Sequence, residues 1–285
     1  MPYRSNVRTR NRKRARTASK RSRRSKRKTK IIDPPFSRSF SKGTLASIGC
    51  CSIDPEDGYH YQNYENISVF LKTIRENNPS MKQHIYLFPQ KKEAFLEYGI
   101  QTDKLTVLEM SYEDFKKDIL KGVYKHTAQF VPIILNLSLT DSENHANILV
   151  VNKKTKIIEL FEPHGARTSS SELGGIQSVY KKKKRALNKF FKKILPGYTI
   201  VNVVEAVRKT AFQMTDDPRG HSGFCVTWSI LYAHYRFLNP DVNLSLLIRY
   251  IHKKINAHYI LRYAKYIETL VKNENQRKFD KHLKK

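Results

Sequence analysis

One cysteine, one histidine and one glutamate of this chain are placed where they could together form an activated nucleophile. Cys225 follows Gly223-Phe224 and opens an apolar run that is typical of a helix and extends to Phe237. A thiol at a helix N-terminus lies beside unpaired backbone N–H groups and the positive end of the helix dipole, and both favour the thiolate. Cys225 is therefore a candidate nucleophile, although a cysteine in such a run is also a common core residue.

A hairpin upstream supplies a candidate base and an acid to orient it. Two runs of β-branched and apolar residues, the first starting at His145 and the second ending at Glu162, are joined by polar residues. If the turn is centred on Lys153 and Lys154, His145 lies directly opposite Glu162, with Cβ atoms roughly 4.5 to 5.5 Å apart. A slip of one residue would put them on opposite faces. A thiolate and an imidazole held by a carboxylate are the parts of a cysteine hydrolase.

The order histidine, acid, cysteine resembles that of the superfamily of SUMO-specific proteases and the adenovirus maturation protease. The 17-residue step from His145 to Glu162 is similar to that superfamily's, as is a cysteine that begins a helix. The stretches Phe161-Glu162-Pro163-His164-Gly165 and Gly223-Phe224-Cys225 look most like the divergent members carried by large double-stranded DNA viruses. Over residues 126–240 the resemblance implies His145 as general base, Glu162 as its orienter and Cys225 as nucleophile. It also implies a papain-like cysteine protease architecture with a circularly permuted order.

Two positions depart from the superfamily pattern. An aromatic residue usually follows the histidine and covers the glycines of the substrate, whereas Ala146 stands here. A glutamine about two turns before the cysteine usually completes the oxyanion hole, whereas that position holds Arg219. Gln213 can act as the oxyanion donor only if the loop between it and Cys225 bulges out. The backbone N–H of Cys225 is the other candidate donor.

Other assignments of these residues stay open at the level of sequence. His164 and His221 lie in loops near the candidate acid and nucleophile, and either could be the base of an unrelated site. The adjacent Cys50 and Cys51 have no second pair at metal-ligand spacing, so neither a zinc site nor a disulfide framework is expected. The bland interpretation is a structural histidine, a rim glutamate and a core cysteine.

The function expected from these residues is that of a cysteine protease, and the resemblance implies cleavage after Gly-containing sequences. Its polypeptide substrate would be a viral precursor or a ubiquitin-like modifier, and an acyltransferase is a close variant. No metal or organic cofactor is expected, although nucleic acid could act as an activator. The alternative is a non-catalytic DNA-binding virion protein that retains the protease fold. The two differ on whether His145, Glu162 and Cys225 converge.

The chain of 285 residues carries a formal net charge of +29, and much of it lies in one segment. Residues 1–30 contain fifteen Lys or Arg and no acid, which predicts a disordered basic arm. Nuclear import, phosphate contacts and an anionic membrane surface are three uses of such an arm, and the absence of an apolar partner helix argues against the membrane. We expect a virion interior or host nucleus, otherwise the cytoplasm, and not secretion. The candidate nucleic-acid contacts are Arg12, Lys13, Arg14, Arg23, Arg24, Lys26, Arg27 and Lys28.

The remaining pattern predicts an α+β fold with a mixed or antiparallel central sheet flanked by helices. After the arm we expect an N-terminal α/β region over 31–125, a catalytic core over 126–240 and C-terminal helices over 241–285. An apolar stripe from Leu187 to Leu195 predicts a helix whose lysines face away from the core, where they can add to a nucleic-acid surface. Strands are expected over 84–89, 104–109, 130–139 and 198–204, and helices over 64–76, 91–98, 111–124, 243–255 and 257–271.

Overall fold

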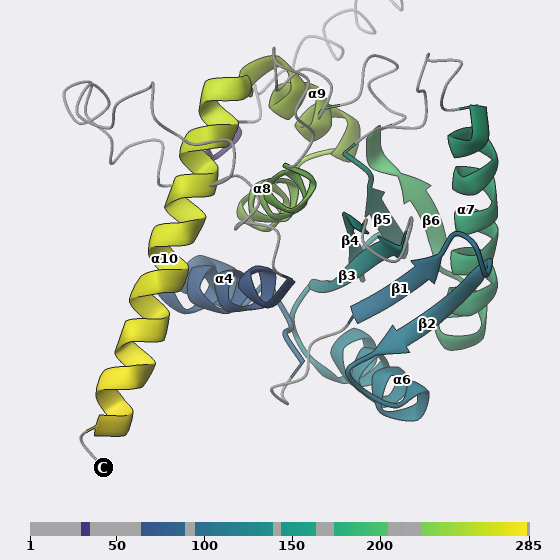
Figure 1. The fold of residues 1–285 in the computed structure, drawn as a ribbon, viewed down its shortest axis with the longest axis horizontal. Helices are drawn as coiled ribbons and strands as arrows, with labels where there is room; N and C mark the ends of the chain where they lie inside the picture. The colour runs from purple at the N-terminus through teal and green to yellow at the C-terminus, as the bar shows by residue number, and fades with distance from the viewer. Residues whose placement is uncertain are drawn as a thin grey trace, which may run out of the picture. The chain divides into compact units, whose positions relative to one another are not determined.

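The structure is a computed structural model that describes residues 30–34, 64–88, 95–138, 144–163, 174–204, 212 and 224–283. Its helices and strands belong to one compact unit, residues 32–285 (Figure 1). In chain order they are α4 (Tyr64–Asn77), α5 (Pro79–Lys82), β1 (Phe95–Gly99), β2 (Lys104–Leu108), α6 (Tyr112–Leu120), the π-helix η3 (Lys121–Lys125), β3 (Phe130–Ser138), β4 (Asn144–Asn152), β5 (Ile157–Phe161), α7 (Gly174–Ile194), β6 (Thr199–Asn202), α8 (Cys225–Leu238), α9 (Leu244–Lys254) and α10 (Ala257–Leu283).

The six strands form one mixed sheet in the order β2-β1-β3-β4-β5-β6. Neighbouring strands are antiparallel except for two pairs, β1 with β3 and β5 with β6, which are parallel. The long strands β3 and β4 lie at the centre, and nearly every residue along them is buried. The predicted α+β class with a mixed central sheet is confirmed.

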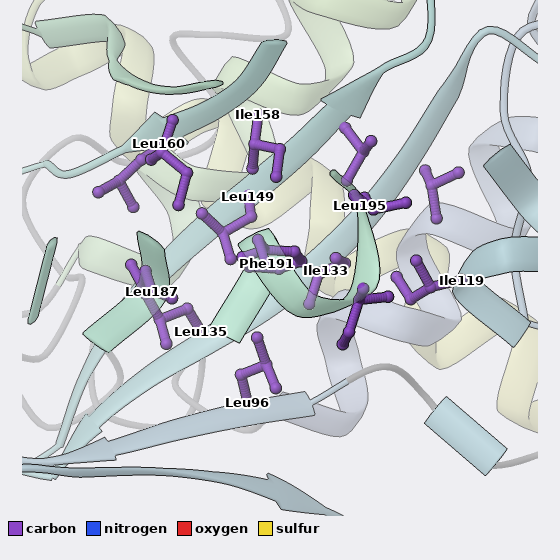
Figure 2. Packing of buried hydrophobic residues seen from close by; sticks show 14 of the residues in the cluster. Leu96, Ile119, Ile133, Leu135, Leu149, Ile158, Leu160, Leu187, Phe191 and Leu195 are labelled. Carbon is purple, nitrogen blue, oxygen red and sulfur yellow. The ribbon is translucent and has the colours of Figure 1, made fainter. Parts of the chain in front are cut away.

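One face of the sheet packs against α7 through a continuous apolar cluster. Side chains of β3, β4 and β5 that point to this face meet the stripe of α7 predicted from the sequence (Figure 2). Burial of such side chains contributes roughly 1.5 to 3 kcal/mol each. The cluster therefore fixes α7 against the strand that carries His145. Its labelled members are Leu96, Ile119, Ile133, Leu135, Leu149, Ile158, Leu160, Leu187, Phe191 and Leu195.

The other face of the sheet packs against α8, which lies across the sheet from α7 (Figure 1). Every residue from Cys225 to Phe237 is buried, because β4 covers one side of α8 while α4 and α10 cover others. Phe161 of β5 stacks on Tyr232 of α8, with ring centroids 4.6 Å apart and an interplanar angle of 4°. Cys225, the first residue of α8, is therefore positioned by a helix that is buried on all sides.

Two expected elements differ from the structure in type, and the last helix, expected over 257–271, continues to Leu283 as α10. The expected helix over 91–98 is wrong in its described part, because Phe95–Gly99 is strand β1, paired to β2 on one side and to β3 on the other. Two ladders of hydrogen bonds outweigh the helix propensity of this Lys- and Glu-rich segment. The expected strand over 84–89 is reduced, among its described residues, to one bridge between Ile85 and Phe130. Among the described residues, no helix has the length and apolarity needed to span a membrane.

Candidate active site

Cys225 is the first residue of α8, as the sequence predicted. Its thiol accepts a hydrogen bond from the backbone N–H of Ala146 in β4, with nitrogen and sulfur 3.5 Å apart. Ser229, one turn further along α8, donates its hydroxyl to the carbonyl oxygen of the same alanine at 3.3 Å. These two bonds fasten the start of the helix to the strand that carries His145.

His145 and Glu162 lie in direct contact at one end of the sheet. Nε2 of His145 is 2.5 Å from Oε1 of Glu162, and the two residues are only 6% and 4% exposed. The histidine comes from the start of β4, and the glutamate is the first residue after β5. His145 also forms a side-chain hydrogen bond with Cys225. The structure therefore brings together the three residues that the sequence singled out.

The register of the hairpin is shifted by two residues from the prediction. We expected His145 directly opposite Glu162, but Phe161 pairs with Ile148. The direct pairing of the two polar residues is therefore wrong. A shift of two residues preserves the alternation of side chains, so both still face the same side of the sheet. They meet as diagonal neighbours, which long side chains can bridge.

The loop of the hairpin explains this shift. Asn152 pairs with Ile157, so the turn spans residues 153–156 and is not centred on Lys153 and Lys154. The Asn152 side-chain oxygen accepts hydrogen bonds from the backbone N–H groups of Lys154 at 3.2 Å and Thr155 at 3.4 Å. Lys156 closes the turn with a φ of 55°, in the left-handed region that side chains other than glycine seldom adopt. The sequence signal for this conformation is weak, because lysine is not a typical residue there.

The site contains a buried lysine that the sequence analysis assigned to the solvent-facing side of its helix. Lys183 of α7 is 1% exposed, and its Nζ lies 2.5 Å from Oε2 of Glu162. The same ammonium donates to Oδ1 of Asn147 at 3.5 Å. A signal for it was present, because Lys183 precedes Leu187 by four residues and Phe190 by seven, the spacing of one helix face. The expectation that all lysines of this helix face away from the core is wrong at this position.

The charges of these groups favour an ion pair. Burial disfavours the imidazolium of His145, but the Glu162 carboxylate and the bond to Cys225 outweigh burial and raise the pKa of His145 to about 9. Burial opposes ionisation of Glu162, yet Lys183 and His145 bring its pKa well below the usual range. Burial also raises the pKa of the Cys225 thiol, whereas His145 and two backbone N–H groups lower it, and the net pKa is lowered. A thiolate facing an imidazolium is therefore stabilised here.

The alanine that departs from the superfamily pattern has a structural reason. Ala146 of β4 is 1% exposed, and its backbone contacts both Cys225 and Ser229 in the first turns of α8. An aromatic side chain at this position would have to displace α8 from the strand. The small residue allows the nucleophile to approach the backbone next to the histidine.

Several predicted site residues lie outside the described residues. They include Gln213, the rival histidines His164 and His221, and the cysteines Cys50 and Cys51. Within the described ranges, no group of three His, Cys, Asp or Glu side chains could hold a metal ion. The arm residues proposed to contact nucleic acid also lie outside: Arg12, Lys13, Arg14, Arg23, Arg24, Lys26, Arg27 and Lys28.

The fold is similar to those of several solved cysteine proteases. ChlaDub1 from Chlamydia trachomatis is 12% identical, with 74% of this chain and 93% of that chain covered and a TM-score of 0.42. The Ulp1 protease domain, solved in complex with Smt3, the yeast ortholog of SUMO, is 9% identical, with coverage of 71% and 74% and a TM-score of 0.33. The ASFV pS273R protease is 13% identical, with coverage of 61% and 60% and a TM-score of 0.35.

No protein-family model matches the sequence, and no curated protein matches it. At these identities and TM-scores the likeness concerns the arrangement of the fold alone. The chemistry of the site rests on the contacts of its own residues.

Proposed function

We propose that this chain is a cysteine protease in which Cys225 is the nucleophile, His145 the acid and base, and Glu162 the group that holds the imidazole. The observation that carries the proposal is the convergence of these three side chains from two strands and a helix start. The sequence alternative, a non-catalytic DNA-binding protein that retains the fold, requires no such convergence. A purely structural role of His145 would also not require its contact with the buried Cys225.

The geometry supports a two-step hydrolysis. The Sγ thiolate attacks the carbonyl carbon, and the backbone N–H of Cys225 stabilises the oxyanion that forms. Gln213 is a second proposed donor, on the condition that the loop between it and Cys225 bulges out. His145 gives its proton to the leaving amine as the C–N bond breaks, which leaves a thioester. His145 then takes a proton from water, the hydroxide attacks the thioester, and the thiolate is restored. Transfer of the acyl group to an amine in place of water is the close variant.

The burial of the Cys225 thiol supports a substrate with small side chains beside the cleaved bond. Cys225 is 6% exposed, so the chain segment that delivers its carbonyl carbon has little room for side chains. Glycine on the acyl side of the cleaved bond meets this requirement, and we propose peptide or isopeptide bonds that follow Gly-containing sequences. The C-terminus of a ubiquitin-like modifier and the cleavage sites of viral structural precursors are the two substrate classes we propose.

A nucleic-acid partner is proposed for the basic parts of the chain. The outward side of α7 carries six exposed cations, and the whole helix has no acidic residue. These cations lie within one third of the helix circumference, opposite the apolar stripe. A surface of one sign attracts phosphates and can add to contacts made by the arm. The six are Lys181, Lys182, Arg185, Lys189, Lys192 and Lys193.

A covalent probe tests the proposed function directly. A short peptide ending in Gly-Gly and an electrophile should label the protein once, and peptide mapping should find the label on Cys225. The Cys225→Ala variant should remain unlabelled, because it has lost the thiol placed at the start of α8 beside His145. Labelling of Cys50 or Cys51 with no label on Cys225 would contradict the proposal, and so would a wild-type protein that takes up no probe.

A further inference from the structure

The candidate site holds four ionisable groups from four different elements. They are His145 of β4, Glu162 after β5, Lys183 of α7 and Cys225 of α8, and each is 6% exposed or less. They form one chain of contacts: the lysine ammonium to the carboxylate at 2.5 Å, the carboxylate to the imidazole at 2.5 Å, and the imidazole to the thiol. Because burial weakens solvation, the charges of such a cluster depend on one another.

Counting the charges shows what the lysine contributes. With the carboxylate ionised and the imidazole protonated, Glu162 and His145 cancel. The thiolate would then be a single negative charge in a site that is almost closed to water, which is costly. The Lys183 ammonium brings the sum of the four groups to zero when the thiolate is present. Without the lysine, the sum is zero only when the thiol keeps its proton.

The residues around the Lys183 ammonium hold it in a defined position. Lys183 lies on the apolar side of α7, where the neighbouring stripe residues are Leu187 and Phe191. Its second acceptor, Asn147, is itself fully buried and donates its amide to the carbonyl oxygen of His145 at 3.4 Å. The asparagine therefore connects the position of the ammonium to the backbone of the histidine. An unpaired lysine is seldom buried to this extent.

We propose that Lys183 is a positioning residue of this site, which balances the Glu162 carboxylate and thereby allows Cys225 to be a thiolate while His145 is protonated. This inference rests on the proposed function for its consequence in catalysis. The state of the thiol, however, can be measured without any substrate. In this scheme the lysine acts through Glu162, which its ammonium contacts, and through His145.

The test is the pH dependence of alkylation of Cys225 by iodoacetamide, measured with Cys50→Ser and Cys51→Ser in the background so that one thiol remains. Lys183→Met keeps the length of the side chain and removes the charge. Its alkylation profile should move to higher pH by about one unit, because the thiolate is no longer balanced. In the double variant Lys183→Met with Glu162→Gln, the only charges left in the cluster are the His145 imidazolium and the Cys225 thiolate, which cancel. Its alkylation profile should therefore return toward that of the wild type. A purely structural lysine would change thermal stability and leave these profiles in place.

The matched control is Lys182→Met, one residue earlier on the exposed side of α7, which should not shift the profile. Superimposed profiles for the wild type and Lys183→Met would overturn the inference, and so would an equal shift in Lys182→Met. If Lys183→Met does not fold, the comparison of Glu162→Gln with the double variant tests the same charge. The double variant should then be alkylated at higher pH, and coincident curves would refute the inference.

This measurement separates the inference from the proposed function. A protein that cleaves no glycine-containing peptide, but shows the expected shifts in alkylation, would refute the protease and retain the role of Lys183. A protein that cleaves such peptides with the same acidic limb in the wild type and Lys183→Met would retain the protease and refute that role.

Discussion

Strand β5 and the residue that follows it carry two buried carboxylates that face opposite sides of the sheet. Glu159 points toward α8, where it accepts hydrogen bonds from Tyr232 at 2.6 Å, from Arg236 at 2.9 and 3.1 Å, and from Asn152 at 3.1 Å. Glu162 points toward α7 and has a charged partner on each oxygen.

The partners of the two carboxylates differ in what they can do with a proton. An arginine guanidinium stays charged in proteins, and Nη1 of Arg236 donates to three backbone carbonyls just after the end of α8. His145 beside Glu162, in contrast, can gain or lose a proton near the pH values at which enzymes work, because its pKa is raised to about 9. One carboxylate is therefore part of a fixed scaffold, whereas the other belongs to a group of charges that can be rearranged during a reaction.

The largest expected effect is on activity, when the nucleophile or the histidine that contacts Glu162 is removed. Cys225→Ala should abolish cleavage of a glycine-containing peptide, and Cys225→Ser should nearly do so, because a hydroxyl is a poorer nucleophile in this setting. His145→Ala should lower kcat by a similar factor, on the order of 1,000-fold or more. The double variant of Cys225→Ala and His145→Ala should lose no more activity than either single variant. Circular dichroism should show that all of them fold, because the Glu159 network is untouched. Unchanged turnover in Cys225→Ala would exclude the proposed mechanism.

The next largest effect should fall on stability alone. Glu159→Gln leaves the Arg236 guanidinium buried without its carboxylate, and breaking such a pair costs about 3 to 5 kcal/mol. Urea unfolding should report this loss, while the folded fraction should keep the kcat and pH profile of the wild type. A Glu159 variant with normal stability and altered pH dependence would reverse the roles assigned to the two carboxylates.

Glu162→Gln should differ from Glu159→Gln by changing the activity of the folded protein. The amide no longer holds the imidazole electrostatically, so kcat should fall roughly 10- to 100-fold, less than for the loss of the histidine itself. Because the pKa of His145 is about 9, wild-type activity should decline above about pH 9. Without the carboxylate this pKa falls, and the alkaline limb should move to lower pH by about one unit or more. An alkaline limb that does not move would show that Glu162 does not set the protonation of the histidine.

A smaller effect is expected on the pH dependence of stability. The pKa of His145 is about 9 in the folded protein against 6.5 for an ordinary histidine, so protonated His145 favours the folded state. This contribution is fully present below about pH 6.5 and is lost as the pH rises through 9. Unfolding free energies measured from pH 6 to 10 should therefore decline more steeply in the wild type than in His145→Ala. Parallel curves would contradict the raised pKa.

Removal of the basic arm, residues 1–30, should have the smallest effect on peptide cleavage. Deleting residues 1–30 should leave the cleavage of a short peptide unchanged, because the site lies more than a hundred residues downstream. The truncated chain should bind duplex DNA more weakly, with the slope of log K against log salt reduced by about 0.9 for each phosphate that the arm neutralises in the full-length protein. Binding to two unrelated duplexes should be similar, since contacts between Lys or Arg and phosphates carry no sequence information. Equal slopes for both proteins would leave nuclear import as the better explanation of the arm.

The sequence predicted the elements of the site better than their exact pairing. A cysteine at the start of a long apolar run marked the start of α8, because a run that is apolar on all sides can only be a buried helix. Alternation placed His145 and Glu162 on one face, and this survived the two-residue shift in register. The shift itself was not predictable, because it depends on a lysine in a left-handed conformation.

Residues that act through tertiary contacts were harder to predict. Lys183 stands among four consecutive lysines, and only its spacing to Leu187 distinguishes it from those that face solvent. Strand β1 has a local sequence that favours a helix, and the ladders on its two sides decide otherwise. Both cases need information on what the segment packs against, which a single sequence does not contain.

The complete burial of α8 has a consequence for how the nucleophile can be lost. Because every residue from Cys225 to Phe237 is enclosed, the amide hydrogens of this helix should exchange only when the whole compact unit opens. Fraying at a surface cannot expose the thiol by itself. Heat inactivation should therefore coincide with cooperative unfolding, and a protein that retains its fold should retain a correctly placed sulfur atom.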